Sequence, residues 1–292
     1  MEVVQDTLLR ADIGELMNFI VQFWLFGGYS IYNCILIFAQ RPGAVMVATE
    51  TSWNARGRYV KHEVSPIVIL RPFGPVDFVY DYDDTFGKRD LFPRRLTRSN
   101  IVEAKDWWTE TLKEALMQNG ILYTESNFGS RKGAELAILE MPRSFEVRRK
   151  GKTDTVQTDV CITVNSMSEK GAQLESIFHE LGHLFCGHLT RGKYTPKDLY
   201  FPNRTNKHLT LNQEECEAEM TKNLVCNLLG LKLEDPFAYI NAYSEEDGKL
   251  PRINFGEIVK AADRILNLIP DSIKNDIKGN TMVHQMTIFD LA

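Results

Sequence analysis

The sequence lacks the cysteine pattern of a secreted, disulfide-bonded domain. Its five cysteines are odd in number, widely spaced and without a CxxC pair: Cys34, Cys161, Cys186, Cys216 and Cys226. This pattern gives no disulfide framework. It predicts reduced thiols and therefore a cytoplasmic protein.

Long apolar runs and an excess of positive charge are also missing. The most apolar stretch, NFIVQFWLFGG, is too short to span a bilayer and is interrupted by Gln22 and a glycine pair. The first residues carry acidic side chains where a secretory signal would carry basic ones. We therefore expect no membrane partner. The formal net charge of −5 means that nucleic-acid binding would need a local basic patch.

What is present suits a globular chain of 292 residues with 43% hydrophobic residues, enough for one large or two ordinary domains. Residues 87–100 are rich in basic side chains, contain a proline and have no apolar period, which predicts an exposed linker. Before it we expect helices at 7–26 and 30–40 and the strands AVMVAT, PIVILRP and DFVYDY. After it we expect a helix at 101–118, strands near 120–124, 134–141 and 158–165, and helices from about 169, at 211–229, 236–244 and 254–268. The prediction is an α+β fold, with a small N-terminal α+β domain over 1–98 and a second domain over 99–292.

The most informative stretch is FHELGHLFCGH, residues 178–188. On a helix, His179 and His183 lie one turn apart on the same face and can bind one metal ion. Glu180 lies beside them and can act as a general base. Apolar residues mark the opposite face of this helix, and Gly182 would let another element approach closely. The pattern therefore predicts a zinc site on an amphipathic helix.

A catalytic zinc ion usually has three protein ligands. Cys186 and His188 follow the motif closely, but neighbours on one helix seldom face the same ion, so we interpret them as the structural end of the helix. The next predicted helix contains LNQEECEAEM, with several acidic residues. Glu215 and Glu219 share one face, so that one could bind the metal while the other orients a histidine, and Glu217 is a rival.

The chain resembles two related groups of proteins. HELGH followed by an acidic helix with an alanine resembles the ImmA/IrrE zinc metallopeptidases. The segments EECEAEMTKNLVCNLLGL, FAYINAY and EIVKAADRIL resemble the metallopeptidase domain of ArdC-type antirestriction proteins. The resemblance implies a zincin-like domain whose third ligand stands three positions before the alanine. Here the alanine is Ala218, which selects Glu215 as the ligand, and Glu219 falls where the family keeps a polar or acidic residue.

The N-terminal half resembles the ArdC N-terminal domain in YSIYNCILIFAQRPGA, Trp53, GRYVKHE and PIVIL. The family associates this domain with single-stranded DNA. Single-strand binding needs basic groups and aromatic stacking platforms, for which the candidates are Trp53, Arg56, Arg58, Tyr59 and Lys61. Two departures weigh against it. The usual Lys-Gly-Glu reads Lys-His-Glu at 61–63, and the segment DYDDTFG is acidic.

Together these features predict a zinc-dependent endopeptidase acting on a cytoplasmic, DNA-associated protein in antirestriction or defence biology. His179, His183 and Glu215 would hold Zn²⁺, which suits this N/N/O ligand set better than magnesium or calcium, and Glu180 would be the catalytic base. VCITVNS would be the sheet edge that adds an extended substrate. Two alternatives stay open. One is a non-proteolytic protein that binds single-stranded DNA or a restriction enzyme and uses zinc structurally, and the other is a protease that cleaves a repressor.

Overall fold

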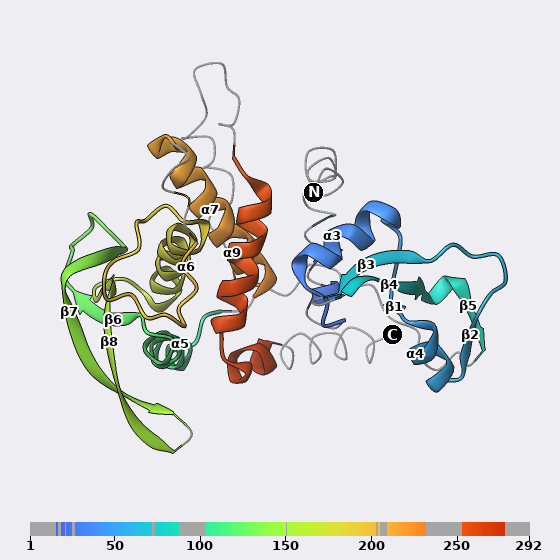
Figure 1. The fold of residues 1–292 in the computed structure, drawn as a ribbon, viewed down its shortest axis with the longest axis horizontal. Helices are drawn as coiled ribbons and strands as arrows, with labels where there is room; N and C mark the ends of the chain where they lie inside the picture. Colours follow the sequence, from blue (N-terminus) through green and yellow to red (C-terminus); the bar gives the residue numbers. More distant parts are fainter. Residues whose placement is uncertain are drawn as a thin grey trace. The chain divides into compact units, whose positions relative to one another are not determined.

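The computed structural model describes residues 16, 19–20, 22–24, 27–71, 74–87, 103–149, 151–202, 204, 209–231 and 253–277 (Figure 1). The chain divides into two compact units, Met1–Ser99 and Asn100–Ala292. The predicted helix at 236–244 lies outside the described residues, as does most of the one predicted at 7–26. Among the helices that are described, none combines the length and apolar character needed to cross a bilayer.

The first unit combines helices with two small antiparallel sheets. Its elements are α3 (Ile31–Gln40), β1 (Val47–Ala48), α4 (Glu50–Ala55), β2 (Arg58–Val60), β3 (Ile67–Arg71), β4 (Gly74–Asp81), a 3-10 turn (Tyr82–Asp84) and β5 (Thr85–Gly87). The strands form one sheet in the order β1-β4-β3 and a separate β2–β5 pair. Helix α3 begins where the Ser30 hydroxyl accepts from the Asn33 backbone N–H. The short helix α4 and the β2–β5 pair were not predicted.

Trp53 organises the core beneath the β1-β4-β3 sheet. Its side chain is 0% exposed, and its indole N–H donates to the Tyr80 carbonyl oxygen at 2.8 Å. The ring of Tyr82 meets the indole edge to face, with the ring centroids 6.1 Å apart. A buried tryptophan supplies a large apolar area and needs a partner for its N–H, and both conditions are met inside this unit.

The second unit has one mixed sheet of three strands, β6 (Leu122–Ser126), β7 (Ala134–Arg149) and β8 (Lys152–Asn165), in the order β6-β8-β7. Strand β6 runs parallel to β8, and β7 runs antiparallel to it with a register shift between Ile138 and Arg143. The hairpin is longer than predicted, and its far end extends away from the helices (Figure 1). The expectation that VCITVNS forms the sheet edge is wrong, because it belongs to the central strand β8, and the edge strands are β6 and β7.

The described residues of this unit include the helices α5 (Asp106–Gln118), α6 (Lys170–Cys186), α7 (Leu211–Leu228) and α9 (Phe255–Leu268), and residues 271–277 are also helical. Helix α6 packs against α7, α9 and the strands β7 and β8. Its predicted apolar stripe, from Leu174 to Phe185, is buried. A Cβ atom added to Gly182 would lie 2.9 Å from the Ala218 carbonyl oxygen, so the glycine permits the close approach of α7. The predicted α+β class is confirmed.

Candidate metal centre

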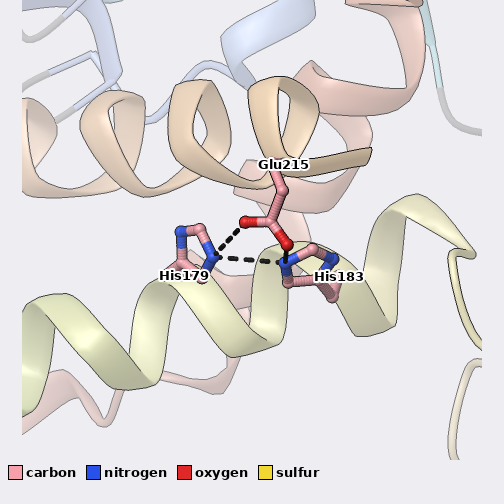
Figure 2. A group of neighbouring side chains, drawn as sticks. All are labelled: His179, His183 and Glu215. Carbon is pink, nitrogen blue, oxygen red and sulfur yellow. Dashed lines mark hydrogen bonds and ion pairs between the residues drawn. The ribbon is translucent and has the colours of Figure 1, made fainter. Parts of the chain in front are cut away.

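Helices α6 and α7 bring two imidazoles and one carboxylate together at a single point (Figure 2). His179 and His183 lie one turn apart on α6, with their Nε2 atoms 3.1 Å apart. Glu215 reaches down from α7, with its oxygens 3.3 Å from His179 Nε2 and 3.6 Å from His183 Nε2. The three side chains are partly exposed, so the point where they meet is accessible to a small ion.

The spacing of these atoms fits a small, tetrahedrally coordinated metal ion. Ligands bound at 2.0–2.1 Å in a tetrahedron lie about 3.3 Å from one another. The distances of 3.1, 3.3 and 3.6 Å among the three side chains of His179, His183 and Glu215 are close to that value. Hydrogen bonds with the two histidines also hold the pKa of Glu215 well below its usual range, so the carboxylate is ionised. The donor set therefore fits a divalent cation.

His179 is oriented from its other ring nitrogen. Its Nδ1 lies 3.1 Å from Glu219 Oε2, and the Lys222 ammonium donates to Glu219 Oε1 at 2.6 Å. Burial lowers the pKa of His179, but the hydrogen bonds with Glu215 and Glu219 outweigh it and raise the pKa to about 9. The structure thus places Glu219 behind the histidine, the position from which a carboxylate fixes ring orientation and tautomer.

The third acidic residue, Glu217, points to a different place. It is completely buried, and it pairs with Arg204 at 2.6 Å and with His188 Nε2 at 3.0 Å. Burial raises the pKa of Glu217, yet these two partners lower it to about 2. Of the three glutamates left open by helical spacing, the structure therefore brings Glu215 alone to the ring nitrogens that face the ion site.

Glu180 lies between the metal-ligand candidates and the edge strand. The backbone N–H of Leu136 on β7 donates to Glu180 Oε2 at 3.0 Å. Burial raises the pKa of this carboxyl, while the nearby histidines and the Leu136 N–H oppose the shift. A glutamate whose pKa lies above its usual range is suited to accepting and returning a proton near neutral pH.

The candidate DNA-binding residues divide into two groups. Trp53 is fully buried and Arg58 is 4% exposed, its guanidinium bound to Thr85 and to the Tyr82 carbonyl. The prediction that Trp53 and Arg58 contact DNA is therefore wrong, because the core residues cover their surfaces. Arg56, Tyr59 and Lys61 are exposed.

Sequence reasoning missed four residues that the structure connects to these sites. Phe86 is 54% exposed and lies beside Tyr59 on the paired strand β5. His188 approaches His183, with their Nδ1 atoms 2.9 Å apart, which corrects its interpretation as a structural helix end. Lys222 and Arg204 hold Glu219 and Glu217. The sequence did contain a signal for His188, because a glycine such as Gly187 often ends a helix. In the structure Gly187 adopts the left-handed conformation at φ 80° and turns the chain back toward the helix.

No protein-family model and no curated protein match this chain. Among solved structures, it is similar to two crystal structures of the antirestriction protein ArdC from R388 plasmid. The Mn(II)-bound structure aligns at a TM-score of 0.34 and 14% identity, covering 91% of this chain and 98% of ArdC. The metal-free structure gives the same score and identity, covering 87% and 85%. At that level of similarity, the chemistry of this chain rests on its own residues.

Proposed function

We propose that the second unit is a metal-dependent peptidase that binds Zn²⁺ through His179, His183 and Glu215. One observation carries the proposal: the ligand atoms of these three residues lie within 4.8 Å of one another on two helices. When bound, a zinc ion would supply Lewis-acid chemistry toward water and toward a substrate carbonyl. Two histidines and one carboxylate are a ligand set typical of zinc hydrolases.

Glu180 is the proton carrier in this proposal. It follows His179 directly, so its carboxylate leaves the helix beside the two histidines. It would take a proton from the attacking water and later return it to the leaving amine. Its raised pKa supports both steps, because a carboxyl group with a raised pKa binds a proton more tightly.

Strand β7 is the element best placed to hold a peptide substrate. It forms one edge of its sheet, and an extended peptide can add main-chain hydrogen bonds to such an edge. The hydrogen bond from Leu136 to Glu180 joins this strand to the residue that would move the proton. The substrate class is therefore an extended protein segment rather than a folded surface.

The test compares the wild type with Glu180→Gln. Cells expressing each protein are compared for new protein N-termini by terminal labelling and mass spectrometry, and bound zinc is measured on the purified proteins. We expect both proteins to hold one zinc ion per chain and only the wild type to generate new termini. Glu114→Gln, an exposed change on α5, is the matched control and should behave as the wild type. Wild type that holds zinc and generates no new termini would contradict the proposal.

A second function is favoured by an exposed aromatic pair in the first unit. Tyr59 and Phe86 are opposite each other on β2 and β5, 52% and 54% exposed, with ring centroids 5.8 Å apart. Exposed aromatic rings with a nearby lysine are the means by which proteins stack and hold single-stranded bases. Lys61 stands next along the same ribbon. We propose single-stranded DNA as the ligand of this ribbon, which would bring the second unit to DNA-associated proteins.

This function is tested with a fluorescent oligonucleotide in increasing salt. The double variant Tyr59→Ala, Phe86→Ala should weaken binding by about 2–6 kcal/mol, at 1–3 kcal/mol per stacked base. Phe78→Ala removes an aromatic side chain of similar exposure, 50%, from β4 and serves as the control. Equal affinity for the wild type and the double variant would exclude the ribbon as the DNA site.

A further inference from the structure

The two histidines of the metal centre are supported differently on the side away from the ion site. Behind His179 stands a carboxylate, Glu219, which can only accept a hydrogen bond when ionised. Behind His183 stands another imidazole, with its Nδ1 atom 2.9 Å from His183 Nδ1. This second imidazole belongs to His188, which is nearly buried and lies just beyond the end of α6.

A proton can lie on only one of the two facing Nδ1 atoms. A neutral histidine that binds a metal through Nε2 carries its proton on Nδ1, so His183 must donate and His188 must accept. His188 then carries its own proton on Nε2, which lies 3.0 Å from Glu217 Oε2. The directions of both hydrogen bonds, from His183 to His188 and from His188 to Glu217, are thus fixed.

Glu217 is held as an acceptor by groups that can only donate. The Arg204 guanidinium reaches both carboxylate oxygens, at 2.6 and 3.2 Å, and the Asn254 backbone N–H donates to Oε1 at 2.8 Å. Arg204 also donates to the Cys186 carbonyl oxygen at 2.9 Å, so it is tied to the end of α6 itself. Such an arrangement leaves a carboxylate that accepts from His188.

A rival interpretation treats Cys186, His188 and Glu217 as a second metal site, since their ligand atoms also lie within 4.8 Å. The positions of the charges oppose it. The cation that neutralises Glu217 is already present as Arg204, buried against both oxygens.

We infer that His188, Glu217 and Arg204 form a positioning relay for His183, holding its Nδ1 proton so that Nε2 points to the metal. The inference rests on the metal centre proposed above and assigns no contact with substrate to His188. Gly187 makes the relay possible. A Cβ there would lie 2.9 Å from the Pro202 carbonyl oxygen and 3.3 Å from Arg204 Cβ, so glycine lets the loop that carries Arg204 pack against the helix end.

Zinc affinity tests the relay, by competition with a coloured chelator on the full-length chain. We expect His188→Phe to weaken zinc binding about 10–100-fold, the usual cost of losing such a support. His62→Phe makes the same chemical change at an exposed position of the first unit and should leave the affinity unchanged. In His188→Ala, added imidazole should restore part of the lost affinity, which a packing role would not predict.

Nitrogen NMR on the zinc-loaded wild type, labelled with ¹⁵N-histidine, tests the same inference without any substitution. We expect the Nδ1–H form for His183 and the Nε2–H form for His188. The opposite tautomer of His188, or unchanged affinity in His188→Phe, would overturn the relay while leaving the metal centre intact. A wild type that binds no zinc would overturn the metal centre and the relay together.

Discussion

The two units use buried charge in different ways. In the first unit, Asp81 accepts from the backbone N–H groups of Val45 and Met46, and Asp84 pairs with Arg41. These groups hold loops and turns in place, and their polar atoms bond to neighbouring groups of the same unit. In the second unit, Glu219 instead holds His179, and Glu217 holds His188, which in turn contacts His183. The Nε2 atoms of His179 and His183 are left to converge on one accessible point.

The difference shows that burial of charge does not by itself identify a functional site. Arg58 is as well covered as the groups around the metal centre, yet its hydrogen bonds end at Thr85 and at the Tyr82 carbonyl. A site needs atoms that remain available after the surrounding groups have been satisfied. Among the described residues, the groups capable of holding a metal ion all belong to the second unit.

Removing a metal ligand from the second unit should have the largest effect. We expect Glu215→Ala to lose bound zinc, from one ion per chain to almost none, because two neutral histidines alone hold the ion weakly. Metal analysis of the purified protein measures this. Glu214→Ala, the adjacent position on α7, should keep its zinc, and a zinc-loaded Glu215→Ala would rule out this glutamate as the third ligand.

The next effect concerns stability. In Glu217→Ala, Arg204 would be left as a buried cation without its partner, and we expect a loss of about 3–5 kcal/mol. In the first unit, Asp84→Ala should cost less, because Arg41 is 37% exposed and water can replace the lost carboxylate. Urea unfolding with zinc chelated, followed by probes in each unit, compares the two. Equal losses of stability in Glu217→Ala and Asp84→Ala would contradict this expected difference between the two units.

Glycine-to-alanine substitutions should show a smaller difference in stability between the two units. Gly182→Ala brings a Cβ against the Ala218 backbone, at 2.9 to 3.3 Å, and should cost about 1–3 kcal/mol by forcing α6 and α7 apart. It should also weaken zinc binding, because Glu215 moves with α7. Gly43→Ala meets nothing within 4 Å and should be nearly neutral. Thermal unfolding and chelator competition on both variants provide the measurements.

Sequence reasoning succeeded where the determining spacing is local. The i,i+4 spacing places His179 and His183 on one face whatever surrounds the helix, and the apolar stripe fixes which face is buried. It could not choose among Glu215, Glu217 and Glu219, because the choice depends on how α7 is rotated. That rotation depends on tertiary contacts such as the close approach of Gly182 to Ala218, which the chain brings together only on folding.

The errors share the same cause. Trp53 was assigned to a DNA surface, but it lies on the short helix α4 with its side chain buried in the core and hydrogen-bonded to strand β4. His188 was set aside because neighbours on one helix diverge, a rule that ends at Gly187, where the backbone turns. The edge strand was misassigned because strand order within a sheet is a long-range property. Each error concerns a contact between segments far apart in the sequence or a break in regular geometry.

The last expected effect is a dependence of zinc affinity on pH. In the metal-free protein, the pKa of His179 is raised from 6.5 to about 9, so its contribution to stability is present below pH 6.5 and is lost as the pH rises through 9. Zinc needs the same ring nitrogen and must displace that proton. Apparent zinc affinity should therefore rise about tenfold per pH unit up to about pH 9 and then level off. In Glu219→Gln the levelling should begin at a lower pH, because one of the two carboxylates that raise the pKa is gone. A flat affinity between pH 6.5 and 9 in the wild type would show that Glu215 and Glu219 do not hold a proton on His179.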